Sequence, residues 1–135
     1  MNYKIIAAQK RHEEFIKSIY KQEKKHLGSF NLYQCWDKYL LKENNNKFWV
    51  IDNVGFVRFA YSKKYNSFIL HDIGIIAHEK RKGYGKVLLD KLPRPLILKC
   101  NADNDKGNAF YKNYGMNKMG NTQTKKGEPQ IVWSI

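Results

Sequence analysis

Apolar residues recur along this chain with two spacings, one typical of helices and one typical of strands. In residues 10–25 and in residues 31–43 they return every three or four positions, which gives each segment one apolar helical face. Gly28 and Ser29 separate these two predicted helices, and Asn31 is suited to cap the second one. The pattern predicts helices at residues 10–25, 31–43, 83–92 and 106–114, and strands at residues 3–8, 47–51, 55–61, 68–77, 96–100, 116–122 and 130–135.

The resulting order is β-α-α-β-β-β-α-β-α-β-β. Short turns join the strands near the middle of the chain, whereas a helix joins residues 68–77 to residues 96–100. This combination predicts an α/β fold with a mixed sheet and helices on both of its faces. With 135 residues and no linker or repeat, the chain has room for one domain, over residues 1–135.

The most informative stretch is a strand, a turn and a helix over residues 68–92. The strand is mostly apolar, and we expect it to be buried on both faces. The helix has Val87, Leu88 and Leu92 on its apolar side. The first amides of a helix lack internal partners and favour an anion, and two glycines let a ligand approach the backbone. The turn therefore predicts a site for a phosphate-bearing ligand, and it consists of Lys80, Arg81, Lys82, Gly83, Tyr84, Gly85 and Lys86.

These residues resemble motif A of the GNAT superfamily, the acyl-CoA-dependent N-acyltransferases. Residues 80–85 fit its pattern Arg/Gln-x-x-Gly-x-Gly/Ala except at the first position, where Lys80 stands. Residues 104–116 resemble motif B, Asn-x-x-Ala/Ser-x-x-x-Tyr-x-x-x-Gly-Phe, with Gly107 and Met116 as small departures. Two motifs in this order are much more specific than either motif alone, and the element order above is also the GNAT order.

The resemblance implies a donor site for acetyl-CoA or another acyl-CoA. In the family the central strand and the strand after motif A splay apart, and the thioester arm enters the gap. By this resemblance, backbone groups of Ile73 and Ile75 pair with the pantetheine arm, the Ile73 amide faces the thioester carbonyl, and Asn104 contacts the arm. The amides from residue 81 to residue 86 hold the diphosphate.

The resemblance also implies direct transfer of the acyl group to an amine. Tyr111 matches the tyrosine that protonates the leaving sulfur, and Tyr114 is an alternative nearly one helical turn further on. The base is less well defined, because Ile69 stands near the position of the family's glutamate. His71 and Asp72 are the candidates, on opposite faces of a regular strand. Either of them could instead be a satisfied polar residue of the sheet.

The acceptor amine is not identified by the sequence. We expect it near the two N-terminal helices and the last hairpin, where four aromatic residues are candidate walls of its site. Most of them are expected to be core residues instead, because large aromatic side chains usually pack. They are Tyr33, Trp36, Trp49 and Trp133.

The formal net charge of +13 widens the range of partners. It is compatible with an ordinary solvated surface, but also with an acidic or nucleic-acid partner. Besides an N-acetyltransferase of small-molecule or protein amines, this charge suggests a GNAT-type enzyme that modifies DNA or tRNA. A third alternative is a basic binding module with a degenerate acyl-CoA site, which Lys80 and the missing glutamate leave open. The oligomeric state, including a homodimer, stays open.

No apolar run approaches the roughly 18 residues that a membrane span needs, and the start of the chain has no apolar core of a signal peptide. We therefore expect a cytoplasmic protein without membrane contact. Cys35 and Cys100 are far apart, and the histidines have no ligand spacing, so no metal site is predicted.

Overall fold

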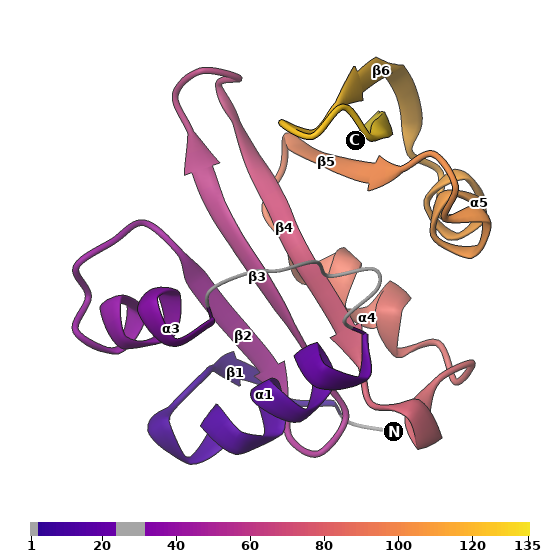
Figure 1. Ribbon diagram of the computed structural model, residues 1–135. Coiled ribbons are helices and arrows are strands. Elements are labelled where there is room, and N and C mark those ends of the chain that lie inside the picture. Colours follow the sequence, from indigo (N-terminus) through magenta and orange to yellow (C-terminus); the bar gives the residue numbers. More distant parts are fainter. Residues whose placement is uncertain (1–2, 24–31) are drawn as a thin grey trace. The chain divides into compact units, whose positions relative to one another are not determined.

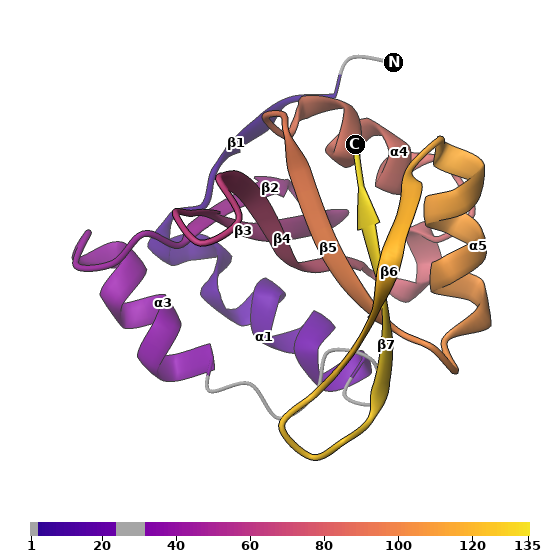
Figure 2. The same cartoon turned by 90° about the horizontal axis from the view of Figure 1, so that it is seen from above.

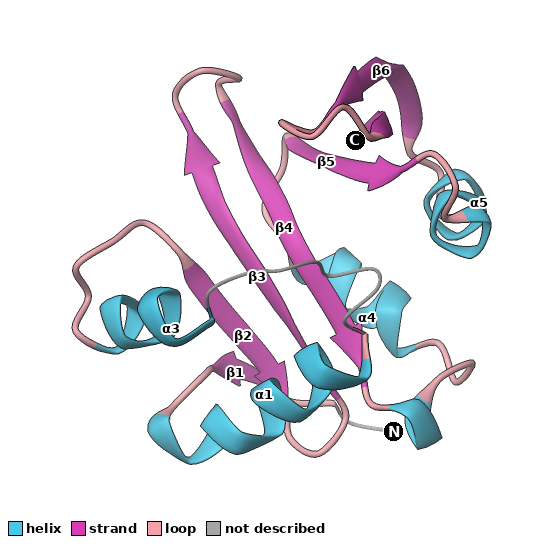
Figure 3. Ribbon diagram, in the orientation of Figure 1, coloured by secondary structure: helices cyan, strands magenta, loops and turns pink. Residues whose placement is uncertain are grey.

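The computed structural model describes the backbone of residues 3–23 and 32–135, and the side chains of the same residues except 32–34. Our predictions for Gly28, Ser29, Asn31 and the side chain of Tyr33 lie outside this range. The strands and helices, with the two short 3-10 turns η1 and η2, follow the predicted order (Figures 1 and 3). They are β1 (Ile5–Ala7), η1 (Lys10–His12), α1 (Glu13–Gln22), α3 (Leu32–Leu40), β2 (Lys47–Ile51), β3 (Gly55–Ser62), β4 (Ser67–Ile75), η2 (Ala77–Glu79), α4 (Tyr84–Lys91), β5 (Leu96–Asn101), α5 (Asp105–Tyr114), β6 (Asn117–Gln123) and β7 (Pro129–Ser134).

The strands form one seven-stranded mixed sheet in the order β1-β2-β3-β4-β5-β7-β6. β4 and β5 are parallel, with Phe68 opposite Leu96 and Leu70 opposite Leu98. The pairs β1–β2, β2–β3, β5–β7 and β6–β7 are antiparallel. The predicted fold class, α/β with a mixed sheet, is confirmed. Within the described residues, no helix is both long enough and apolar enough to cross a membrane.

The chain forms two compact units, and β3 and β4 each contribute to both. The first unit comprises Met1–Ala60 and His71–Leu92, and the second comprises Tyr61–Leu70 and Pro93–Ile135.

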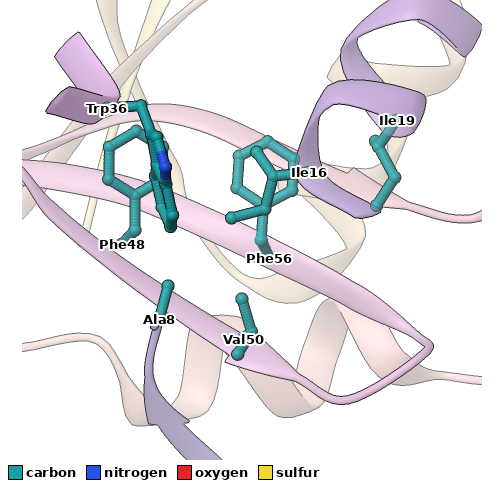
Figure 4. Close-up of a cluster of buried hydrophobic side chains, with 7 residues drawn as sticks. All are labelled: Ala8, Ile16, Ile19, Trp36, Phe48, Val50 and Phe56. Carbon is teal, nitrogen blue, oxygen red and sulfur yellow. The ribbon is translucent and has the colours of Figure 1, made fainter. Parts of the chain in front are cut away.

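In the first unit, helices cover both faces of the strands, with α1 and α3 on one face and α4 on the other (Figures 1 and 2). A cluster of buried side chains fills the space under α1 and α3 (Figure 4). Its members are Ala8, Ile16, Ile19, Trp36, Phe48, Val50 and Phe56. The apolar faces predicted for the two N-terminal helices therefore do form the core.

α1 packs directly on the backbone of β4, and a glycine makes this possible. A Cβ atom at Gly74 would lie 2.4 Å from Cγ2 of Ile19 and 3.0 Å from the ring of Phe56. Real Cβ atoms do not approach other atoms so closely, so the helix could not sit at this depth over any other residue. The close packing fixes α1 against the second half of β4.

The second unit joins the first part of β4 to β5, β7 and β6, and α5 lies beside these strands (Figure 2). The indole Nε1 of Trp133 donates a hydrogen bond of 2.9 Å to Oδ1 of Asn108, which ties β7 to α5. The amide of Asn108 in turn donates to the carbonyl oxygens of Asn101 and Asn104. The helix that carries the motif B residues is thus anchored at its first turn.

Two details of the prediction for residues 68–92 are wrong. Burial alternates along β4: Leu70 and Gly74 are buried, whereas His71 is exposed and Ile73 is half-buried. The strand is therefore buried on one face only. In α4, Leu88 and Leu89 are buried together with Leu92, and Val87 is only half-buried. Positions 88 and 89 lie four and three residues before Leu92, so these three share one stripe.

A buried ionic network joins β4 to β3 and α1 in the first unit. Oδ2 of Asp72 accepts a hydrogen bond of 2.7 Å from Nε of Arg58 and another of 2.7 Å from the hydroxyl of Tyr20. The side chains of Arg58 and Asp72 are only 12% and 7% exposed. Burial and the neighbouring Asp72 carboxylate raise the pKa of Tyr20, so its hydroxyl stays protonated and donates.

We expect Asp72→Asn to destabilise the fold by about 3 kcal/mol, because it leaves the buried Arg58 guanidinium without its counter-charge. Urea unfolding of the purified variant measures this change. Glu14→Gln is the matched control, since Glu14 pairs with Lys17 but is 86% exposed. Exposed pairs contribute about 0–1 kcal/mol. Equal stability of the two variants would contradict the structural importance of the buried pair.

Candidate active site

The turn between β4 and α4 has an unusual backbone for a segment with so few glycines. Arg81 has φ of 65° and Gly83 has φ of 87°, both in the left-handed region. Gly83 is the N-cap residue of α4, and no side chain caps this helix. A Cβ atom at Gly83 would have no heavy atom within 4 Å, so the space beside this position is open.

Six consecutive amides in this turn have no acceptor in the described part of the protein. They run from residue 81 to residue 86, and the first amide that closes a helical hydrogen bond is that of Val87, which donates to Gly83 at 3.2 Å. These donors add to the positive end of the α4 dipole. The arrangement is suited to an anion with several oxygens, such as a diphosphate.

The basic side chains of the turn differ in their partners. Lys80 pairs with Glu23 of the segment after α1, Lys82 with Glu79 at 3.2 Å, and Lys86 with Asp90 at 3.4 Å. Among the described residues, Arg81 has no ion-pair partner. Lys82 and Lys86 are 55% and 70% exposed, so their pairs are weak and can give way to a bound anion.

Of the two candidate bases, the structure puts only one on the more open face of β4. The side chain of His71 is exposed, and Ile73 and Ile75 on the same face are half-buried. Asp72 points to the opposite face, where Arg58 and Tyr20 engage its Oδ2 atom. Its carboxylate therefore already has a structural role in the network that holds β3, β4 and α1 together.

The motif B residues lie in the second unit. Asn104 is the N-cap of α5, and its Oδ1 accepts a hydrogen bond of 3.0 Å from the amide of Gly107. Tyr111 is buried, and its ring centroid lies 5.3 Å from that of Phe110. Tyr114, the alternative acid, accepts a hydrogen bond of 2.9 Å at its hydroxyl from Arg94.

The remaining candidates have mainly structural surroundings. Trp36 and Trp133 are buried in the cores of their units, as expected for large aromatic residues. Trp49 is half-buried and makes an edge contact with Phe59, with ring centroids 4.7 Å apart. Burial raises the pKa of the Cys100 thiol to about 11, which makes it a poor nucleophile. The described residues contain no group of side chains that could hold a metal ion.

Sequence reasoning missed two features of this region. Arg58 is the one charged residue of β3, and this isolated charge was a signal that a buried acid should pair with it. Gln22 gave no signal, since a polar residue near the end of a helix is ordinary. Yet its side chain forms hydrogen bonds with the backbone of both Ile75 and Ala77.

No family model matches the sequence. No curated protein matches it either.

Solved structures match the fold over nearly the whole chain. A point mutant of spermidine N-acetyltransferase SpeG from Vibrio cholerae has a TM-score of 0.78 at 14% identity, over 98% of this chain and 92% of that chain. A Desulfovibrio desulfuricans protein assigned to the GNAT acetyltransferases has a TM-score of 0.79 at 13% identity, over 99% of this chain and 98% of that chain. Arabidopsis thaliana NAA60, in complex with a bisubstrate analogue, has a TM-score of 0.77 at 10% identity, over 99% of this chain and 97% of that chain. Together with the element order and the mixed sheet, these matches establish that the chain has the fold of the GNAT acetyltransferases.

Proposed function

We propose that this protein is an acyl-CoA-dependent N-acyltransferase that transfers an acetyl group to an amine, with both units acting as one acyltransferase domain. The observation that carries the proposal is the row of six unbonded amides that opens α4, in a chain with the GNAT fold. An anion is the natural ligand of such a row. Coenzyme A supplies one in its diphosphate.

The chain's own groups have separate tasks in donor binding. The amides of residues 81–86 and the guanidinium of Arg81 bind the diphosphate. Backbone groups of Ile73 and Ile75, on the strand that leads to this turn, pair with the pantetheine arm. Asn104 contacts the same arm.

The transfer step needs a polarised carbonyl, an unprotonated amine and a proton for the departing sulfur. The Ile73 amide donates a hydrogen bond to the thioester oxygen while the amine nitrogen bonds to the carbonyl carbon and the carbon–sulfur bond breaks. Tyr111 gives its proton to the sulfur. His71 takes the proton of the amine, directly or through water, since Asp72 is committed to Arg58 and Tyr20.

The acceptor is an amine of a small molecule or of a protein. One structural neighbour acts on spermidine, which is a polycation. The net charge of +13 opposes binding of a polycation and favours a neutral or acidic acceptor for the present chain.

A second candidate function, binding of nucleic acid, rests on the distribution of unpaired charge. All residues of the second unit are described, and none of its lysines forms an ion pair. They are Lys63, Lys64, Lys99, Lys106, Lys112, Lys118, Lys125 and Lys126.

Two exposed tyrosines accompany these lysines. The ring of Tyr65 lies 5.3 Å from Nζ of Lys64 and 5.5 Å from Nζ of Lys99, and these ammonium groups lower the pKa of its hydroxyl. Tyr61 and Tyr65 are each 39% exposed. Exposed aromatic rings among lysines are typical of surfaces that bind single-stranded nucleic acid.

Gly83→Glu is expected to weaken acetyl-CoA binding at least about 100-fold, equivalent to about 2.7 kcal/mol. The new carboxylate occupies the open space beside the amides and repels a diphosphate. Isothermal titration calorimetry measures the affinity. Gly127→Glu is the matched control, because Gly127 has φ of 85° and equally open surroundings but lies between β6 and β7. Equal affinity of the two variants would remove the diphosphate from this turn.

Tyr111→Phe is expected to lower kcat by about 100-fold, the lower end of the usual contribution of a general acid. Its affinity for acetyl-CoA should stay within about threefold of wild type, a difference below 1 kcal/mol. Steady-state kinetics with an acceptor found by screening, together with calorimetry, separates the two effects. Tyr114→Phe is the control. A loss of turnover in that variant instead would move the acid role to Tyr114.

The second candidate predicts that a fluorescein-labelled single-stranded oligonucleotide binds and that its affinity falls steeply with salt. Each neutralised phosphate contributes a slope of about −0.7 in a plot of log K against log salt. Replacing Lys64 and Lys99 with glutamate should weaken binding more than the same change at Lys118 and Lys126. Absence of binding at low salt would eliminate this function.

A further inference from the structure

The last residue of α1 and the residue after it hold both ends of the connection between β4 and the diphosphate-binding turn. Gln22 bonds the backbone at the end of β4, and Glu23 pairs with the side chain of Lys80, where the turn begins. Two adjacent residues at the C-terminal end of α1 therefore hold a connection that runs from Ile75 to Lys80.

Gln22 uses both ends of its side-chain amide. Its Nε2 donates a hydrogen bond of 3.0 Å to the carbonyl oxygen of Ile75, and its Oε1 accepts one of 2.8 Å from the amide of Ala77. Between these two contacts, the amide of Ile76 donates to the carbonyl of Val54 at 2.8 Å. The backbone is thus held on both sides just where β4 ends.

Lys80 occupies the first position of the motif A pattern, and its ammonium group forms an ion pair with Glu23. The side chains of Lys80 and Glu23 are 47% and 15% exposed, close to the 55% and 20% of Lys82 and Glu79, and less exposed than those of Lys86 and Asp90. The next residue, Arg81, has a left-handed backbone, and its amide is the first of the row without an acceptor in the described part of the protein. The Lys80–Glu23 ion pair therefore lies directly before the first of the six unpaired amides.

We propose that Gln22 and Glu23 are positioning residues of the donor site, and that Lys80 serves as their tether and not as a ligand of the diphosphate. They keep the backbone of residues 75–80 in the form that presents the amides of residues 81–86 to the donor. This inference rests on the proposed function, because it assumes that an acyl-CoA binds the turn.

The physical reason is preorganisation. A row of amides binds an anion well only if it is fixed beforehand, since ordering the loop would otherwise consume part of the binding free energy. α1 can serve as the fixed support, because Ile19 packs against the backbone of Gly74 on β4. The same helix thus contacts β4 and, through its last residue and the next, the connection that follows β4.

The first test compares Gln22→Leu with Lys21→Leu, its neighbour on the same helix. Lys21 is exposed and has no partner among the described residues. We expect Gln22→Leu to raise the Kd for acetyl-CoA about tenfold, which corresponds to about 1.4 kcal/mol. The KM for the acceptor and the midpoint of urea unfolding should stay near the wild-type values. The Lys21→Leu variant should bind acetyl-CoA like the wild type.

The second test exchanges the charges of Glu23 and Lys80. Each single variant, Glu23→Lys and Lys80→Glu, should weaken acetyl-CoA binding, because like charges then face each other. The double variant restores the pair with reversed polarity, so we expect it to recover affinity to within about threefold of wild type. If Lys80 contacts the diphosphate directly, the double variant will bind as poorly as Lys80→Glu alone, and the tether role is excluded.

The outcomes separate this inference from the proposed function. If wild-type protein does not bind acetyl-CoA, the proposed function itself fails. If wild-type protein binds and Gln22→Leu binds equally well, only the positioning role of Gln22 is overturned. A fall in unfolding midpoint that accounts for the lost affinity would also overturn it, since the residue would then act through stability alone.

Discussion

The unsatisfied amides at the start of α4 are the constraint on which our functional account depends. A helix must leave its first amides without internal partners, and most proteins cover them with a capping side chain or water. Here a left-handed Arg81 and a left-handed Gly83 extend the unpaired row to six residues, and no side chain caps it. Such a row is suited to an anion, so the local backbone defines the class of ligand before any side chain is considered.

The rest of the first unit keeps this backbone in place. Gly74 lets α1 lie directly on β4, and the buried network of Asp72, Arg58 and Tyr20 ties the same strand to β3 and to α1. A buried ion pair contributes little net stability compared with an apolar pair, but it is costly to break, so it favours one arrangement over others. Asp72, which its position in the sequence made a candidate base, therefore serves to hold β4 to β3 and α1. His71 lies on the exposed side of the same strand.

The sequence was sufficient for the fold because apolar spacing, glycines and prolines mark nearly every element of this chain. It also predicted the turn at residues 80–86, since Gly83 and Gly85 between an apolar strand and an apolar helix have few other uses. It did not predict that β4 is open on one face, because Ile69, Ile73 and Ile75 are apolar wherever they point. Nor could it assign Gln22 or the partner of Lys80, since these contacts join residues more than fifty positions apart. Side-chain partners of this kind depend on packing, which periodicity does not report.

The most direct test of the central claim is amide NMR during a titration with coenzyme A. If the diphosphate binds the start of α4, the backbone amide signals of residues 81–86 should shift most, and those of Gly83 and Gly85 should be among the largest changes. The amides of the turn around Gly127 should not move. A titration in which coenzyme A leaves the signals of residues 81–86 unchanged, or shifts other amides instead, would contradict the account.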